Sequence, residues 1–128
     1  MNHVILILVS MIFCHIIDDY VLRAPCLCNL KQKSWWQKNT PNLNYRYDYL
    51  VGLLMHSISW SFMIMLPIII SLKGELNWLW FLLPLNVIIH MKVDDLKANK
   101  GRLNLVEDQT IHLIQIGFTW LLYMLNYM

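Results

Sequence analysis

The chain has little charge. Charged residues make up only 14% of its 128 residues and hydrophobic residues 58%, against about 25% and about 45–50% in soluble domains. This deficit excludes a soluble enzyme domain and a disordered tail, because too few charges remain to cover a water-exposed surface. The net charge of +2 also excludes a nucleic-acid binder that relies on a broad basic face.

Glycine, proline and cysteine are scarce as well. Four Gly and four Pro exclude a fibrous or low-complexity chain. Three Cys cannot all pair within the chain, which excludes a disulfide scaffold. A chain of this length holds one domain at most. We therefore expect a small integral membrane protein with a single domain, residues 1–128.

Long hydrophobic runs fill most of the chain. Four of them are long enough to cross a bilayer: residues 4–22, 49–72, 76–93 and 110–128. At 1.5 Å per residue they reach roughly 27–36 Å, which matches a hydrocarbon core of about 30 Å. The first run has neither the basic flank nor the small-residue cleavage site of a secretory signal, so we expect it to be retained. The sequence predicts an all-α fold, a bundle of four transmembrane helices.

Basic residues predict the orientation. The connection 23–48 carries five Lys and Arg, the stretch 92–108 carries four, and the connection 73–75 carries one. The positive-inside rule then places the first two in the cytoplasm and both termini outside. We expect a multi-pass protein of the inner (cytoplasmic) membrane whose main partner is the lipid bilayer. The 23–48 loop either lies on the anionic inner leaflet or is a solvated linker.

Ionisable residues interrupt the membrane segments in a repeating pattern. Three pairs are four residues apart, and so share a helix face: His15 with Asp19, His90 with Asp94, and Asp108 with His112. The second segment adds a lone His56. Because successive segments run in opposite directions, each His lies about 6 Å deeper than its Asp. The histidines and carboxylates should therefore converge in two layers near the cytoplasmic mouth of the bundle.

Converging imidazoles and carboxylates predict a metal site. These groups suit zinc, iron or manganese, and helix bundles build such sites from inward-facing side chains. Seven residues are the candidate ligands of the divalent ion: His15, Asp19, His56, His90, Asp94, Asp108 and His112. Seven ligands would suffice for two ions, unless some carboxylates only orient the His rings. For any single pair, the simpler interpretation is a hydrogen-bonded His with its carboxylate partner.

Four residues are candidates for catalysis. Asp94 or Asp108 could act as general base toward a metal-activated water. Lys97, one turn beyond Asp94, is expected to contact a substrate anion. Gln109 could donate a hydrogen bond to the substrate or to a ligand carboxylate, or it could simply satisfy the start of its own helix.

The same residues resemble the motif series of a membrane family of bacteria and phages, the domain of unknown function 3307. The likeness covers nearly the whole chain: His15-x-x-x-Asp19-Tyr20-x-Leu22, the lone His56, His90-x-x-x-Asp94-x-x-Lys97, and Asp108-Gln109-x-x-His112. Arg23 stands where a Gln usually follows the first motif of that family. The resemblance implies a small polytopic membrane protein with these residues as its signature, and it implies no activity.

The pattern favours a metal-dependent, hydrolase-like membrane enzyme that acts on a phosphate- or lipid-containing substrate at the cytoplasmic face. The first alternative is a cation or proton transporter or channel that uses the same residues as a homo-oligomer. Against it, the outer halves of the helices carry almost no charge and offer no polar path across the membrane. The second alternative is a non-catalytic membrane interaction protein in which the polar residues lock the helices together.

Overall fold

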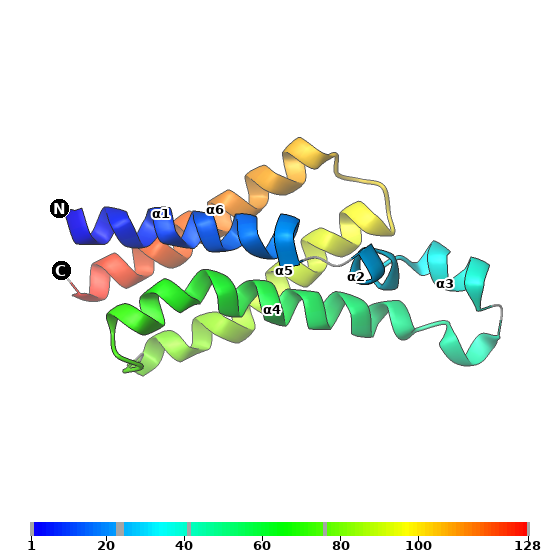
Figure 1. Cartoon of the computed structure of the whole chain (residues 1–128), viewed down its shortest axis with the longest axis horizontal. Helices are drawn as coiled ribbons and strands as arrows, with labels where there is room; N and C mark the ends of the chain where they lie inside the picture. The colour runs from blue at the N-terminus through cyan, green and yellow to red at the C-terminus, as the bar shows by residue number, and fades with distance from the viewer. Residues whose placement is uncertain (1, 23–24, 41, 76, 128) are drawn as a thin grey trace.

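The regular secondary structure of the described part of the chain consists of helices, joined by short turns and connections (Figure 1). The computed structural model describes residues 2–22, 25–40, 42–75 and 77–127, and no strand occurs among them. The all-α prediction is thereby confirmed. The elements in chain order are α1 Asn2–Ile16, η1 Ile17–Leu22, α2 Pro25–Leu30, α3 Lys33–Asn39, η2 Leu43–Tyr45, α4 Asp48–Ser71, η3 Asn77–Phe81, α5 Leu82–Ala98 and α6 Leu105–Tyr127.

The long helices pack side by side. Helix α1 packs against α4 and α6, and α5 packs against the same two helices. Both chain termini and the turn between α4 and η3 lie at one end of the molecule, which we name the terminal end (Figure 1). The short helices α2 and α3 and the connection 99–104 lie at the opposite end, the loop end.

Two helical stretches among the described residues are long and apolar enough to cross a membrane, His3–Leu22 and Leu43–Ser71. Helix α5 has only 17 residues, and α6 begins with several polar side chains. Large apolar side chains nevertheless lie exposed on all four long helices. Examples are Phe13, Ile70, Ile88 and Ile114.

Helices α5 and α6 extend beyond their predicted bounds at the loop end, and at the terminal end α5 begins at Leu82 rather than at residue 76, after the 3-10 helix η3. Helix α5 continues past residue 93 to Ala98, and α6 begins at Leu105 rather than at residue 110. A hydropathy pattern detects only the apolar part of a helix, whereas backbone hydrogen bonding continues into the polar turns. The extra turns keep Asp94 and Asp108 on regular helix, so the four-residue spacing does place each beside its histidine.

The apolar core occupies the terminal half of the molecule. Fully buried side chains from several helices meet there, among them Met11, Ile64, Ile68, Leu79 and Ile116. Trp60, also fully buried, lies at the boundary between this core and the polar groups of the loop end.

The 23–48 connection folds back onto α4. Gly52 permits this approach, since a methyl group at that position would lie only 2.6 Å from the carbonyl oxygen of Leu30. The same carbonyl accepts a hydrogen bond of 2.7 Å from the indole nitrogen of Trp36. Helices α2 and α3 of this connection therefore pack against α4, whereas residues 42–47 are exposed.

Helix α5 holds the junction between α2 and α3 from the other side. The side chain of Asn99 accepts a hydrogen bond of 2.7 Å from the backbone nitrogen of Lys33. It also donates one of 3.1 Å to the backbone oxygen of Lys31. These contacts fix the backbone of Lys31, whose side chain points into the molecule and is buried.

Candidate metal centre

The seven predicted ligands lie together at the loop end. They come from all four long helical segments, and each is at most 5% exposed: His15, Asp19, His56, His90, Asp94, Asp108 and His112. Asp18, buried beside them, is an eighth member. We refer to these eight residues as the His/Asp cluster.

His90, Asp94 and His112 form the centre of this cluster. The Nε2 atom of His112 lies 3.6 Å from Asp94 Oδ1 and 3.4 Å from Asp108 Oδ1. His90 Nε2 lies 3.9 Å from Asp94 Oδ1, and the rings of His90 and His112 are stacked with centroids 4.3 Å apart. One ligand atom from each of the three central residues lies within 4.8 Å of the other two.

A second trio adjoins the first. Asp19, His56 and His90 also bring one ligand atom each within 4.8 Å of one another. His56 Nε2 lies 3.5 Å from Asp19 Oδ1 and 3.5 Å from Asp94 Oδ2. Because His90 belongs to both trios, they are two sides of one site rather than independent sites.

The separations within the cluster suit ligands that share a metal ion. Hydrogen bonds between nitrogen and oxygen run about 2.7–3.2 Å, so most of these contacts are too long. Ligands placed tetrahedrally at about 2.0–2.2 Å from a zinc-type ion lie roughly 3.3–3.6 Å from each other. The spacings around His112 and His56 fall in that range.

Many atoms of the cluster lack a hydrogen-bond partner. Among the described residues, seven of its buried nitrogen and oxygen atoms have none: Asp18 Oδ2, His56 Nε2, both ring nitrogens of His90, Asp108 Oδ1 and both ring nitrogens of His112. Each such atom costs about 1–3 kcal/mol when buried unpaired. A neutral imidazole has a lone pair on only one ring nitrogen, so these atoms offer one lone-pair nitrogen from each of the three histidines together with two carboxylate oxygens. Such a set of donors in one place indicates a site that suits a cation.

The charges of the cluster suit a single divalent ion. Two buried or half-buried ammonium groups enter it. Lys31 pairs with Asp94, and Lys97 pairs with Asp108 at 2.5 Å. Against these two positive charges stand four carboxylates: Asp18, Asp19, Asp94 and Asp108. When the histidines are neutral, as metal ligation requires, four minus two leaves two negative charges, which one divalent cation would neutralise.

His15 has both ring nitrogens engaged, which departs from its predicted role as a ligand. The indole of Trp60 donates to His15 Nδ1 at 2.8 Å. His15 Nε2 must then carry the proton, which it donates to Gln109 Oε1 at 3.1 Å. In this arrangement His15 has no lone pair left for a metal.

Gln109 connects His15 to two carboxylates. Its amide nitrogen donates to Asp19 Oδ2 at 3.2 Å and to Asp108 Oδ2 at 3.1 Å. Of its predicted roles, the structure therefore shows the contact with candidate ligand carboxylates. His15 and Gln109 together orient the acidic groups in the way that outer hydrogen bonds orient metal ligands.

Lys97 is the most exposed charged group at the cluster, with 27% of its side chain accessible. It was predicted to contact a substrate anion, but its ammonium group already pairs with Asp108. Burial raises the pKa of Asp108, whereas the interactions with His112 and Lys97 outweigh it and lower that pKa to about 2. Asp108 is therefore a carboxylate at neutral pH.

Asp18 and Lys31 are members of the site that the sequence did not predict. Asp18 accepts a hydrogen bond of 2.6 Å from Ser59 and lies 3.7 Å from His56 Nδ1. It faces inward beside Asp19 because residues Ile17–Leu22 wind as a π-helix, a rare form found often at functional sites. The adjacent acidic pair at the end of an apolar run was the available signal for Asp18. Lys31 had no local signal, since its partner is 63 residues away.

Comparison with protein-family models, curated proteins and solved structures found no match to this chain. The likeness to the domain of unknown function 3307 therefore stays a prediction. The geometry of the His/Asp cluster carries the functional inference by itself.

Proposed function

We propose that this protein is a membrane-embedded metalloenzyme of the hydrolase type. It holds one divalent ion, zinc, iron or manganese, in the His/Asp cluster and acts on a phosphate- or lipid-containing substrate at the cytoplasmic face. The observation that carries the proposal is the set of seven buried, unpartnered nitrogen and oxygen atoms that converge there.

The proposal includes four transmembrane helices in the inner membrane, with the loop end in the cytoplasm. The exposed apolar side chains on α1, α4, α5 and α6 support it, since they suit contact with lipid. Cysteine labelling tests it in a variant whose native cysteines are replaced by serine. An impermeant maleimide applied to intact cells should label Glu75→Cys and spare Asn39→Cys. The reverse pattern would contradict the orientation.

The residues of the cluster have separate roles in this proposal. His90, Asp94 and His112 hold the ion, with His56 and Asp19 beside them. A bound divalent ion lowers the pKa of a water molecule toward neutrality and polarises the group to be cleaved. Asp108 serves as general base, since its Oδ1 lies beside His112 and has no hydrogen-bond partner among the described residues.

The cationic groups sit where substrate would approach. Lys97 offers the accessible positive charge at the edge of the cluster, which suits a phosphate group. Lys31 covers Asp94 from the α2–α3 junction, so this segment would have to shift for substrate to reach the centre.

The two alternative functions have weaker support. A transporter needs a polar route through the terminal half, where the core beyond Trp60 is built from side chains such as Ile64 and Ile68. A structural lock is expected to satisfy its own hydrogen bonds, because each unpaired buried group destabilises the fold.

Hydrolysis of a phosphodiester tests the enzymatic part. The purified protein, reconstituted with Zn²⁺ or Mn²⁺, should cleave bis-p-nitrophenyl phosphate or a short-chain phospholipid. Asp108→Asn and His56→Ala should lower the rate by about a hundredfold or more, because general-base catalysis alone contributes roughly 10²–10⁴-fold. A metal-loaded wild-type protein that cleaves none of these esters would contradict the assignment as a hydrolase.

A further inference from the structure

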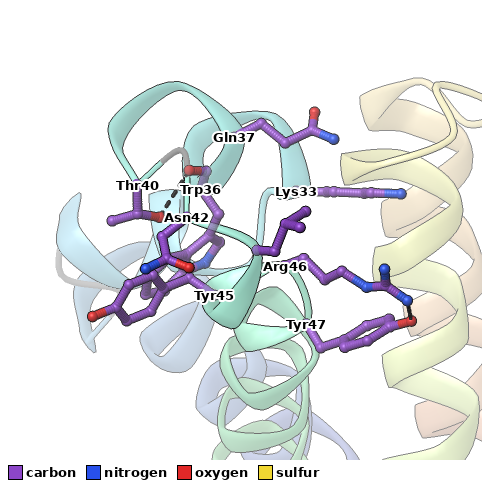
Figure 2. A pocket seen from close by; sticks show the side chains of 9 residues that line it. Lys33, Trp36, Gln37, Thr40, Asn42, Tyr45, Arg46 and Tyr47 are labelled. Atoms are coloured by element: carbon purple, nitrogen blue, oxygen red, sulfur yellow. Dashed lines mark hydrogen bonds between the residues drawn. The ribbon is translucent and has the colours of Figure 1, made fainter.

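A cavity of about 430 Å³ lies between α3 and η2, outside the His/Asp cluster. Its walls carry two cations, Lys33 and Arg46, and the ring of Trp36, which is stacked with that of Tyr45 at a centroid distance of 6.4 Å. Figure 2 shows the ammonium of Lys33 and the guanidinium of Arg46 extending to the same side of this cavity. Among the described residues that line it, none carries a carboxylate.

Neither cation is neutralised by a carboxylate. The ion pairs that Lys and Arg side chains form within the described residues involve only Lys31, Lys97 and Lys100. Arg46 lies over the ring of Tyr47, 4.4 Å from its centroid, and donates to the hydroxyl of the same residue. Guanidinium and ammonium groups held in this way are suited to binding a phosphate group.

An apolar groove of about 340 Å³ also borders Trp36. The two hollows share Trp36, and the groove passes Val51 and Met55 on α4, whose side chains are 60% and 58% exposed. This part of α4 belongs to the stretch that is long and apolar enough to cross a membrane. A cationic cavity followed by an apolar groove matches an amphiphile with a phosphate head and a hydrocarbon tail.

We propose that the cavity and the groove together bind one glycerophospholipid. Its phosphate lies at Lys33 and Arg46, and one acyl chain follows Val51 and Met55. Asp48 also lines the groove, so its negative charge favours the phosphate at the two cations rather than at the groove entrance. The proposal rests on the membrane placement argued above and is independent of the metal.

Native mass spectrometry of the detergent-purified full chain, with dioleoylphosphatidylglycerol added, tests the site. The variant Lys33→Gln/Arg46→Gln should retain about tenfold less bound lipid than the wild type, because basic groups near a phosphate each contribute measurably to binding. The matched control Lys38→Gln/Arg102→Gln removes two exposed charges at the same end. It should retain lipid within about twofold of the wild type. Equal loss in the control, or no loss in the first variant, would overturn the proposal.

Two further arms separate a lipid from free phosphate and the lipid site from the metal site. Glycerol 3-phosphate in excess should leave lipid binding unchanged, while Met55→Trp, which fills the groove, should lower it. Displacement of the lipid by glycerol 3-phosphate in the same excess would overturn the lipid as occupant. Metal content measured on the same samples should be the same in Lys33→Gln/Arg46→Gln and the wild type, so a failure of either proposal is recognised separately.

Discussion

Two buried polar clusters lie one helical turn apart on α5 and α6, and they differ in how they satisfy their hydrogen bonds. We call the one nearer the terminal end the amide cluster: Asn86, Gln115 and Thr119. Gln115 donates to Asn86 Oδ1 at 2.7 Å, and Asn86 donates to Thr119 Oγ1 at 3.1 Å. Thr119 also donates to the backbone oxygen of Gln115 at 2.9 Å.

The side chains of the amide cluster satisfy nearly all of their hydrogen bonds, whereas those of the His/Asp cluster do not. Among the described residues, the amide cluster leaves one buried side-chain atom unpaired, Gln115 Oε1, whereas the His/Asp cluster leaves seven. His90 follows Asn86 by a single turn of α5, so the two clusters share one helix face and similar burial. Polar groups that only join helices complete their own hydrogen bonds, and groups that hold a cation keep lone pairs free for it.

Trp60 lies between the His/Asp cluster and the apolar core of the terminal half. Its ring stacks on His90 with centroids 4.2 Å apart and planes at 20°, while its indole nitrogen donates to His15. Ile64, one turn along α4, already belongs to the apolar core. The aromatic ring thus closes the His/Asp cluster toward the terminal half.

Removing a central ligand should have the largest effect on metal binding. We expect His112→Ala to lose its bound metal, with affinity at least about a hundredfold lower, since orienting groups alone contribute 10–100-fold. The helices should remain inserted and folded, because packing and lipid contacts hold them. Metal analysis and thermal unfolding in detergent check this. If the variant instead fails to accumulate in the membrane, the His/Asp cluster has a structural role, as the amide cluster does.

Removing an orienting group should have a smaller effect. Gln109→Leu abolishes the hydrogen bonds to Asp19 and Asp108 without removing a ligand. We expect metal affinity to fall by about 10–100-fold while binding persists at high metal concentration. Competition against a fluorescent zinc indicator measures this. A loss as complete as that in His112→Ala would instead make Gln109 part of the coordination sphere.

Removing the internal cation should strengthen metal binding. Lys31→Gln removes a positive charge from beside Asp94 and frees a carboxylate oxygen. We expect affinity for a divalent ion to rise by about tenfold, while the metal-free protein becomes less stable because Asp94 loses its partner. Titration with Zn²⁺ tests the predicted gain in affinity, and thermal unfolding of the metal-free protein tests the predicted loss of stability. Weaker binding would refute the charge balance proposed for the site.

Changing the amide cluster should leave metal binding unaltered and lower stability. Asn86→Ala removes the side-chain hydrogen bonds to Gln115 and Thr119, which keep only their bonds to backbone oxygens, so we expect the free energy of unfolding to fall by about 1–3 kcal/mol. Ile88→Ala, at an exposed position of the same helix, is the matched control and should change stability less. Loss of metal in Asn86→Ala would show that the two clusters are one functional unit.

The sequence predicted what depends on helix geometry. The four-residue spacing of His and Asp, combined with alternating helix direction, predicted that His90, Asp94, Asp108 and His112 converge in two layers at one end of the bundle. Hydropathy found the four long helices, but it missed α2 and α3 in the 23–48 connection. It also ended too early at the loop end, where α5 and α6 continue as polar turns beyond their apolar parts.

The features of the site that the sequence did not predict depend on contacts between distant residues and on the local π-helical conformation of the backbone. In the sequence, Lys31 looks like any basic residue of a loop. Its burial depends on contacts with distant residues: Gly52 allows the backbone before it to approach α4, and Asn99 donates a hydrogen bond to its backbone oxygen. Asp18 faces inward through a π-helical turn that a regular helical wheel does not contain. The spacing of His15 is that of a ligand, and only the indole of Trp60 shows that its lone pair is already used.

The metal-to-protein ratio of the purified wild-type chain tests the central claim most directly. The protein should be isolated without chelators, incubated with Zn²⁺, Fe²⁺ or Mn²⁺, freed of unbound ion by gel filtration and measured by inductively coupled plasma mass spectrometry. The charge balance of the His/Asp cluster predicts about one divalent ion per chain. A folded protein that retains none of these ions would contradict the account, and two ions per chain would contradict the charge balance.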